Sequence, residues 1–497
     1  MSEPAPGARE DALLGPLARL GIAARRGFGR LTPEPFVIAV LLTALVAVAS
    51  FAQLVGDAAG PAAALRQMTE RWHSSSGLWG LLTFAMQASL MLVLGGALAA
   101  APVFRRGLER LATWPKSPRA LVGLTAALSI VTALVNWSLG LICGALFARA
   151  AGREAARRGW RLHYPLLCAA GYAGMMVWHG GLSGTAPLKA TTERDMIEVL
   201  GPELAARVGT IPLTESVFGG LNLMVSGGLL LLGPLLFALL TPKPGADPDP
   251  APPPASVAEG SAAPPEEAPP ADALERLERS PWITWILALP MLGALGLFVA
   301  GQGVGEGIGL SPTRWISAAV YGISKLDLNT VNLALWVAAM ILHRRPDRFL
   351  AACEEGIRGC TGIFLLFPLY AGIMGLMATS GLSARLAGLF ADVGGEFFAV
   401  LTFFAAGLLN LFVPSGGGQW AIQGPILCES ALARGVAPAD AMMAMAFGDQ
   451  WSNMLQPFWA MPLLAITGVR ARDIVGYCAL WMAAGGLWIV VCLLAKA

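Results

Sequence analysis

An uncharged run of 32 residues, from Phe397 to Cys428, places the tightest constraint on how this chain can fold. About 20 apolar residues are enough to cross the hydrocarbon core of a bilayer, so the run is long enough to lie within one. However, Pro414 and Gly416–Gly418 interrupt its centre, and these residue types break the helical hydrogen-bond ladder. Broken backbone at membrane depth is tolerated only where protein or a watery cavity satisfies the freed N–H and C=O groups. The run therefore predicts a binding site inside a membrane protein.

The composition places the whole chain in the same class. Of its 497 residues, 56% are hydrophobic and 13% are charged, which is typical of polytopic helical membrane proteins. The seven cysteines show no CxxC spacing, so neither a disulfide framework nor a metal site is predicted. The first apolar run lacks a small-residue cleavage site, so we expect a retained first span and not a removed signal peptide. The net charge of +2 gives no indication of a nucleic-acid partner.

The distribution of arginine and lysine predicts the topology of the first half, residues 33–240, because cytoplasmic loops are enriched in both. After two full spans, the uncharged run 120–148 lies between two basic stretches that are both expected on the cytoplasmic side. A single crossing cannot return to the same side, and two full crossings need roughly 40 residues. We therefore predict a re-entrant hairpin that turns near Asn136. The next segment, 162–188, is rich in glycine and is predicted to be a broken transmembrane helix.

The second half, residues 328–497, is predicted to repeat this order from the opposite side of the membrane. Its hairpin is the run 397–428, and its broken helix is expected at 442–469. Inverted repeats with broken helices recur in secondary transporters, whose substrates bind near the membrane midplane. The predicted fold is therefore an all-α polytopic membrane protein of two inverted repeats, each with a re-entrant hairpin and a broken transmembrane helix, with about nine full spans plus the two hairpins.

Residue spacing supports the internal repeat. Asn136 precedes Pro187 by 51 residues, and Asn410 precedes Pro462 by 52. The strings around the two asparagines, Ala-Leu-Val-Asn-Trp-Ser-Leu-Gly and Gly-Leu-Leu-Asn-Leu-Phe-Val-Pro, are also alike. Together with the topology, these matches favour duplication of one structural unit.

Three further segments complete the predicted organisation. Residues 1–32 form a basic N-terminus, which we expect in the cytoplasm, with the C-terminus on the periplasmic side. Residues 241–280 are rich in proline and alanine and are predicted to be a largely disordered cytoplasmic linker, with a docking segment as the alternative. Residues 281–327 are predicted to form a joining helix and an outer loop.

The polar residues predicted at membrane depth are the candidate binding residues. Glycine lets a ligand approach bare backbone, and the N-terminus of a half-helix attracts an anion such as a carboxylate. Carboxamide and hydroxyl oxygens can orient that anion or coordinate Na⁺, for which we expect positions near Asn136 and Asn410. The candidate substrate- and ion-binding residues are Asn136, Ser138, Ser183, Thr185, Asn410, Ser415, Gly416, Gly417, Gly418, Gln419, Asp449, Gln450, Asn453 and Gln456.

Asp449 is the sharpest of these candidates, because an acidic side chain near the bilayer centre costs about 2.5 to 3.5 kcal/mol on insertion scales. It could hold Na⁺ or carry a proton, and the alternative is that it only caps or braces the broken helix. For His179, a hydrogen-bonded spacer is favoured over a proton carrier. The tryptophans Trp178, Trp420, Trp451 and Trp459 are expected to be packing residues or interface anchors.

Five strings in this chain resemble those of the short-chain fatty acid transporter (AtoE-type) family, over about residues 30–495. They are Val135-Asn-Trp-Ser-Leu-Gly-Leu, His179-Gly-Gly-Leu-Ser-Gly-Thr-Ala-Pro-Leu188, Leu328-Asn-Thr-Val-Asn-Leu, Val413-Pro-Ser-Gly-Gly-Gly-Gln-Trp-Ala-Ile-Gln-Gly-Pro425 and Gly448-Asp-Gln-Trp-Ser-Asn-Met-Leu-Gln-Pro-Phe-Trp-Ala-Met-Pro462. The family tends to have glycine where this chain has His179, and glutamate or aspartate at the position of Asp449. This departure leaves the role of His179 open.

The resemblance implies uptake of short-chain carboxylates such as butyrate or acetoacetate across a bacterial inner membrane. It also implies the paired hairpins, inverted repeats and elevator motion of the ion transporter superfamily. The expected function is thus secondary active symport of a small monocarboxylate with Na⁺ or H⁺. No cofactor other than the coupling Na⁺ or H⁺ is expected. The expected partners are the substrate and the lipid bilayer, and a homodimer of this chain is left open.

Two other functions are weighed against this carrier. A channel, or a carrier for another small organic anion such as a dicarboxylate, is the alternative, although a single isolated acid at broken helices is more typical of a carrier. A membrane-embedded enzyme ranks last, because the sequence has no HExxH or GxSxG string at membrane depth. No Walker A string is present to suggest that ATP drives transport.

Overall fold

The protein is built from helices throughout the part of the chain that the computed structural model describes. This part comprises residues 15–31, 33–57, 60–160, 162–242, 270, 272–300, 328–357, 360–388 and 397–496. The helices are α2 (Pro16–Leu31), α3 (Pro35–Asp57), α4 (Pro61–His73), α5 (Leu82–Ala100), α6 (Pro102–Ala112), α7 (Pro118–Val135), α8 (Trp137–Arg157), α9 (Tyr164–Tyr172), η1 (Ala173–Met176), η2 (Trp178–Gly180), α10 (Thr185–Lys189), α11 (Glu193–Leu200), α12 (Pro202–Val208), α13 (Gly220–Leu240), α15 (Ala273–Glu278), α16 (Pro281–Ala300), α18 (Leu328–His343), α19 (Pro346–Ile357), α20 (Thr361–Thr379), α21 (Leu382–Gly388), α22 (Phe398–Asn410), α23 (Gly416–Ala433), α24 (Pro438–Ser452), η5 (Asn453–Leu455), α25 (Pro457–Thr467) and α26 (Ala471–Lys496).

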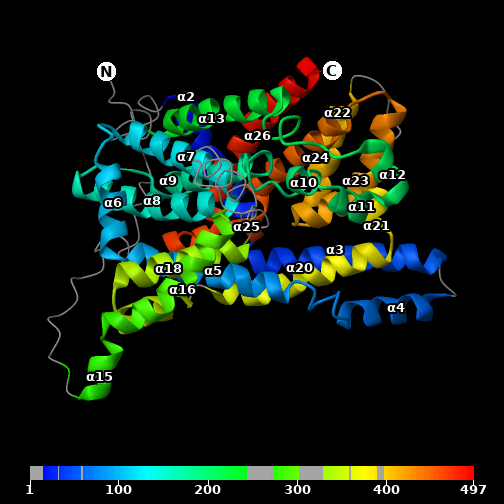
Figure 1. Ribbon diagram of the computed structural model, residues 1–497. Coiled ribbons are helices and arrows are strands. Elements are labelled where there is room, and N and C mark those ends of the chain that lie inside the picture. The colour runs from blue at the N-terminus through cyan, green and yellow to red at the C-terminus, as the bar shows by residue number, and fades with distance from the viewer. Residues whose placement is uncertain are drawn as a thin grey trace, which may run out of the picture.

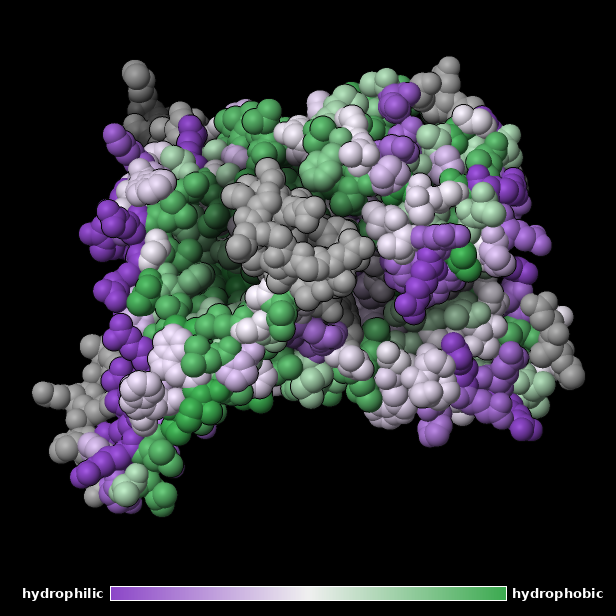
Figure 2. Space-filling model, in the orientation of Figure 1, coloured by the Kyte–Doolittle hydropathy of each residue, from purple (hydrophilic) through white to green (hydrophobic). Residues whose placement is uncertain are grey.

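The helices form two groups (Figure 1). In one layer, α3 packs on α20, and α5 packs on α18 and α19. The second group lies against this layer and contains α7, α8, α9 and α13 on one side of the view and α22, α23 and α24 on the other. Hydrophilic residues gather mainly toward the left and right margins of the same view, with apolar surface between them (Figure 2). Several long helices, among them α3, α7, α8 and α20, lie roughly along the direction that joins these two margins (Figure 1).

Five helices in the described part of the chain are long and apolar enough to cross a membrane, or six if a bent pair is counted as one span. They are Pro35–Gly56, Pro118–Val135, Gly220–Leu240, Ala273–Leu297 and Ala471–Lys496, and the bent pair is Ala85–Leu98 with Pro102–Ala112. Shorter apolar helices include Asn329–His343, Phe364–Thr379 and Phe398–Asn410. A multi-helix membrane protein is confirmed, whereas the count of nine spans and the re-entrant character of the hairpins remain predictions.

The first helical hairpin turns at a single residue, Asn136, between α7 and α8. Asn136 has extended backbone and caps α8, because its side chain accepts hydrogen bonds from the backbone N–H groups of Ser138 and Leu139. The two arms approach closely at Gly140, where an added Cβ would lie 2.4 Å from the Cβ of Ala133. Only glycine fits there, so this residue determines how tightly the hairpin closes.

One boundary of the first hairpin differs from the expected 120–148. Helix α8 continues to Arg157, so most of the basic stretch after residue 148 is helical and not a loop. Buried Glu154 explains the difference, because it forms ion pairs with Arg157 at 2.7 Å and Arg158 at 2.5 Å. Arg158 also donates to the backbone oxygens of Thr113 and Pro115, which ties the end of α8 to the preceding turn.

The second hairpin consists of α22 and α23, joined by residues 411–415. Ser415 is the N-cap of α23 and accepts a hydrogen bond from the N–H of Gly418. Pro414 therefore stands just before a new helix, where a missing N–H costs little. The break seen in the sequence is a turn between two helical arms.

Two helices are broken at corresponding places after the hairpins. After α9, the chain forms two short 3₁₀ helices, η1 and η2, and resumes as α10 at Thr185. After α24, it forms η5 and resumes as α25 at Pro457. Each break leaves backbone groups without helical partners, so other parts of the protein must supply them.

The linker region also differs from its prediction. Residues 243–269 lie outside the described part of the chain, as do residues 301–327 of the joining segment and residues 1–14 and 32 of the basic N-terminus. At the end of the predicted linker, however, Ala273–Glu278 is helical, because Asp272 caps it by accepting a hydrogen bond from the N–H of Glu275. At least this end of 241–280 is ordered structure that leads into the next span.

Candidate functional site

The two broken helices meet at a buried contact between His179 and Asp449. The Nδ1 atom of His179 lies 2.5 Å from Oδ2 of Asp449, and the two side chains are 0% and 1% exposed. The backbone N–H groups of His179 and Gly180 both donate to Oε1 of Gln450, at 3.0 and 3.1 Å. The first break is thus held by two adjacent side chains of the second broken helix.

The hydrogen bonds around His179 define its tautomer. The backbone N–H of Ala186 lies 3.1 Å from Nε2 of His179, so Nε2 must accept and cannot carry a proton in this arrangement. The ring proton is therefore on Nδ1, which donates to the Asp449 carboxylate. In this arrangement, the His179 ring donates through Nδ1 and accepts through Nε2, as a neutral imidazole does.

Asn410, at the turn of the second hairpin, binds the second break. Its Nδ2 lies 2.9 Å from the backbone oxygen of Asp449, 2.9 Å from Oγ of Ser452 and 2.7 Å from Oδ1 of Asn453. Gln456 completes the contact by donating from Nε2 to the backbone oxygen of Asn410 at 2.5 Å. One carboxamide thus satisfies groups freed where the helix ends.

The turn of the first hairpin binds the first break in a different way. The N–H of Leu182 donates to the backbone oxygen of Leu134 at 2.7 Å, and the N–H of Trp137 donates to Oγ of Ser183 at 2.9 Å. Oδ1 of Asn136 already accepts from the N–H of Ser138, the hydroxyl of Ser138 and the N–H of Leu139, at 3.0, 2.6 and 3.2 Å. Asn136 and Ser138 therefore serve here as a helix cap.

The tip of the second hairpin lies on the first break. A Cβ added at Gly416 would lie 2.8 Å from Cε1 of His179 and 2.9 Å from Cη2 of Trp178, and one at Gly417 would lie 3.1 Å from Cγ2 of Thr185. Glycine is therefore required at residue 416 for this close approach. Gly417 and Thr185 are half-buried, so the N-terminus of α23 reaches the accessible edge of the cluster.

Several polar atoms of the cluster have no hydrogen-bond partner among the described residues. Those with acceptor capacity are Oδ1 of Asn410, Oε1 of Gln419 and Oε1 of Gln456, and those with donor capacity are Nε2 of Gln450 and Nδ2 of Asn453. Buried polar atoms normally have partners, because leaving one unpaired costs about 1–3 kcal/mol. These atoms are available to bind an ion, a water molecule or a substrate.

Gln419 has a mainly structural position. Its Nε2 donates to the backbone oxygen of Ala406 and to Oε1 of Gln423, both at 2.9 Å. Ala406 belongs to α22, so Gln419 holds the two arms of the hairpin together. Its unpaired oxygen is the only part of this side chain left for a ligand among the described contacts.

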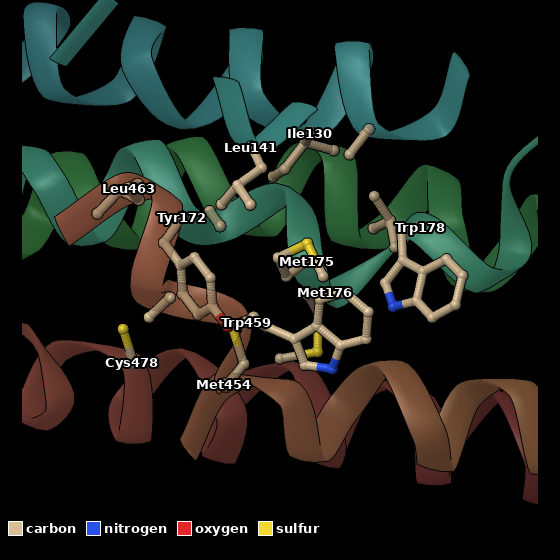
Figure 3. Close-up of a cluster of buried hydrophobic side chains, with 14 of the residues drawn as sticks. Ile130, Leu141, Tyr172, Met175, Met176, Trp178, Met454, Trp459, Leu463 and Cys478 are labelled. Atoms are coloured by element: carbon tan, nitrogen blue, oxygen red, sulfur yellow. The ribbon is translucent and has the colours of Figure 1, made fainter. Parts of the chain in front are cut away.

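Three tryptophans line one side of the cluster, and their arrangement was not predicted. The rings of Trp137 and Trp459 are 5.1 Å apart, and each lies 6.4 Å from Trp178, which stacks on His179 at 4.4 Å. Figure 3 shows Trp178 and Trp459 in a buried cluster with Met175 and Met176. Trp178 and Trp459 are only 3% and 8% exposed, so they pack in the interior, which was one of the two roles expected for them.

The other two tryptophans are packing residues, which was one of the two expected roles. Trp420 is fully buried, and Trp451 donates from Nε1 to the backbone oxygen of Met482 at 2.8 Å. Trp137 was expected at the turn of the first hairpin but was not among the candidate site residues. Its position next to Asn136, at the turn of a hairpin, was the available signal.

Together, these features define a class of protein. Its many apolar helices fit a bilayer, and its buried polar centre lies where two helical hairpins meet two broken helices, an arrangement typical of transporters. No group of three or more His, Cys, Asp or Glu residues that could hold a metal ion occurs among the residues placed by the structure. The apolar helices and the buried polar centre therefore define a helical membrane transport protein.

Comparison with known sequences identifies the family. A sequence profile described as "Short chain fatty acid transporter" matches residues 17–495. The chain belongs to the short-chain fatty acid transporter family, as its sequence strings indicated. Members of this family are transporters and not enzymes, which agrees with the expectation.

Two relatives cover nearly the whole chain. A protein of Escherichia coli strain K12, provisionally named short-chain fatty acid transporter, is 35% identical over 467 residues, which are 93% of this chain and 96% of the relative. A protein of Haemophilus influenzae with the same provisional name is 32% identical over 451 residues, which are 90% and 92% of the two chains.

Two solved structures are distantly similar. The YdaH transporter of Alcanivorax borkumensis gives a TM-score of 0.42 at 16% identity, covering 93% of this chain and 97% of that one. MtrF of Neisseria gonorrhoeae, from a class of antimetabolite efflux pumps, gives 0.36 at 15% identity, covering 95% and 96%. Both TM-scores are below 0.5.

Proposed function

We propose that this protein is a secondary active symporter that carries short-chain fatty acids or related small monocarboxylates, such as butyrate or acetoacetate, together with Na⁺ or H⁺. The observation that carries the proposal is the convergence of two hairpin turns and two broken helices on one buried polar cluster, centred on His179 and Asp449. Family membership supports a short-chain fatty acid as the substrate class.

The N-terminus of α23 is the proposed site for the substrate carboxylate. Gly416 and Gly417 bring bare backbone to the cluster, and the positive end of the helix dipole attracts an anion. Thr185 lies beside Gly417, and Ser415 precedes Gly416 at the start of the same helix, so their hydroxyls are the groups proposed to orient it. The unpaired Nδ2 of Asn453 and Nε2 of Gln450 are further donors within the same cluster.

Charge balance supports coupling to a cation. Asp449 is buried, and in its ionised form it would repel a carboxylate bound nearby by about 4 kcal/mol at 4 Å and an effective dielectric constant near 20. One Na⁺ or H⁺ carried with the substrate removes this repulsion. The coupling cation is thus proposed to make substrate binding favourable.

The two groups of helices suggest how the site could face each side of the membrane in turn. We propose that the hairpins and broken helices move as a transport unit against the layer that contains α3, α5, α18 and α20. This is an elevator-like form of alternating access, in which the predicted inverted repeats would move against each other around the site. A homodimer formed through the static layer would keep that layer fixed.

The basic residues suggest the orientation. The proposed location is the bacterial inner membrane, with the N-terminus in the cytoplasm and the C-terminus in the periplasm. Arg105, Arg106 and Arg110 on α6 and the arginines at the end of α8 then face the cytoplasm together.

The experiment that tests the function is uptake of radiolabelled butyrate into proteoliposomes, with Na⁺ and pH gradients imposed in turn. Accumulation above the external concentration under one gradient supports a symporter. Accumulation of a dicarboxylate instead would favour the alternative of another small organic anion, and flux that no ion gradient can concentrate would favour a channel. If no acid of two to six carbons enters under either gradient, the substrate assignment is wrong.

A further inference from the structure

We propose that His179 is a positioning residue that orients the Asp449 carboxylate for the coupling cation, an inference that rests on the proposed symport. The contact joins residues 270 positions apart in the chain, one in each half of the protein. The contact can therefore make cation binding at Asp449, in the second half, depend on the geometry of the first half around His179.

The His179 ring is fixed on all sides. Its two nitrogens bind Asp449 and Ala186, and its own backbone N–H donates to Gln450. Its face stacks on Trp178 with an interplanar angle of 15°. The ring cannot rotate without breaking one of these contacts, so it holds Oδ2 of Asp449 in one place.

This geometry leaves the cation a defined partner. A neutral imidazole does not cancel the charge of Asp449, and its N–H occupies only one carboxylate oxygen. Oδ1 is not part of the contact with His179, so it is the oxygen through which Asp449 can bind a cation. Without the His179 contact, the carboxylate could rotate about χ2 and would pay an entropic cost on binding.

A purely structural role makes a different prediction. If His179 only braces the first break, the bond that matters is the one from the N–H of Ala186 to Nε2. If it positions Asp449, the bond that matters is the one from Nδ1 to Oδ2. Two substitutions separate these bonds, because an asparagine carboxamide can replace the donor at Nδ1, whereas a glutamine carboxamide oxygen can replace the acceptor at Nε2.

The experiment compares wild-type, His179→Asn and His179→Gln proteins by uptake of radiolabelled butyrate into proteoliposomes. Butyrate is saturating, and the concentration of the coupling cation is varied. We expect His179→Asn to keep a half-saturating cation concentration within about threefold of the wild type. We expect His179→Gln to raise it roughly tenfold or more, the size of effect expected from one charge-assisted hydrogen bond. In both variants, the fold-change in the maximal uptake rate should be smaller than the fold-change in the half-saturating cation concentration.

The opposite order, with Gln near wild type and Asn impaired, would show that His179 is only a brace and would overturn the proposal. Equal effects of both substitutions on the half-saturating concentration would do the same. The Asp449→Asn background provides a further test, because that variant should retain only butyrate exchange. If His179 acts through the Asp449 carboxylate, adding His179→Gln should leave the exchange rate unchanged, and a further loss of exchange counts against the proposal.

Protein that fails to fold is recognised by size-exclusion chromatography. A variant that fails to fold is replaced by His179→Gly with free imidazole added at about 10 mM, which is on the order of weak-site affinities. The added imidazole should restore the affinity for the coupling cation. Absence of rescue in folded protein contradicts the proposal. Failure of the proposed function is distinguishable, because the wild-type protein would then show no cation-coupled uptake at all.

Discussion

Gly416 of the second hairpin lies directly against His179 of the first break, where an added Cβ would come within 2.8 Å of the imidazole Cε1. This close approach brings the two halves together at the same point as the His179–Asp449 contact. Because residue 416 has no side chain, the hairpin tip can close tightly over the cluster.

Gly416→Ala should lower the maximal rate of butyrate uptake roughly tenfold, because overpacking costs about 1–3 kcal/mol and about 1.4 kcal/mol is a factor of ten. The control is Gly418→Ala, where the nearest atom would be 3.4 Å away, an ordinary contact. Uptake in proteoliposomes measures both. Equal rates for the two variants would show that the tip need not close on His179.

Asp449→Asn should abolish concentrative uptake while leaving butyrate exchange between two equal pools measurable, because the carboxamide cannot bind the coupling cation as a carboxylate does. Asp440→Asn is the matched control, since Asp440 lies in the first turn of the same helix and pairs with Lys496 at 3.8 Å. Both proteins should elute as folded material. Normal concentrative uptake by Asp449→Asn would exclude it from coupling.

Glu154 should make stability depend on pH. Hydrogen bonds from Arg157 lower its pKa, burial opposes this, and Arg158 lowers it further, so the net shift is below the ordinary value. Because the folded-state pKa is depressed, the contribution is present above the unfolded-state pKa, near 4.3, and is lost as pH falls through the folded-state value.

Accordingly, Glu154→Gln should lower the Tm at pH 7, and its difference from wild type should shrink as pH is reduced below about 4. Differential scanning fluorimetry in detergent measures this difference. Glu109→Gln is the control, because Glu109 is more exposed and its nearest arginine nitrogens lie at 3.4 and 3.6 Å. A constant Tm difference across the pH range would contradict the assigned ion pairs.

Cysteine labelling tests the inverted topology. In a cysteine-free background, Val135→Cys should react with a membrane-impermeant thiol reagent from the cytoplasmic side and Ser415→Cys from the periplasmic side. Val135 ends α7 next to the turn of the first hairpin and is 38% exposed, and half-buried Ser415 lies at the turn of the second. The native cysteines must be removed because seven occur in the chain. Labelling of both positions from one side only, in every state, would contradict opposed hairpins.

Much of the fold was predictable because its signals are local. Pro414 and the glycines after it mark a helix break wherever they occur, and the string around Asn136 marks a turn. The end of α8 was missed because arginines were counted as loop residues, whereas Glu154 neutralises two of them within a helix. Charge counting finds the side of the membrane but not the helix end.

The site was predictable only in part. Asp449, Asn410 and Asn453 do come together. His179 was judged a spacer, because nothing in its own neighbourhood indicates a partner 270 residues away. Contacts between distant segments depend on how helices pack, and a single sequence has no periodicity that records them.

The two breaks are held by chemically different bonds, and this difference affects which mutations each half tolerates. The second break depends on the carboxamide of Asn410, so many single substitutions at that residue would loosen it. The first is held partly by a bond between the backbone atoms of Leu182 and Leu134, which no side-chain identity encodes. Proline is the one replacement at residue 182 that removes this donor. The first half can therefore change its side chain at residue 182 while the geometry persists, whereas residue 181 must stay glycine, because an added Cβ there would lie 2.5 Å from the backbone oxygen of Leu134.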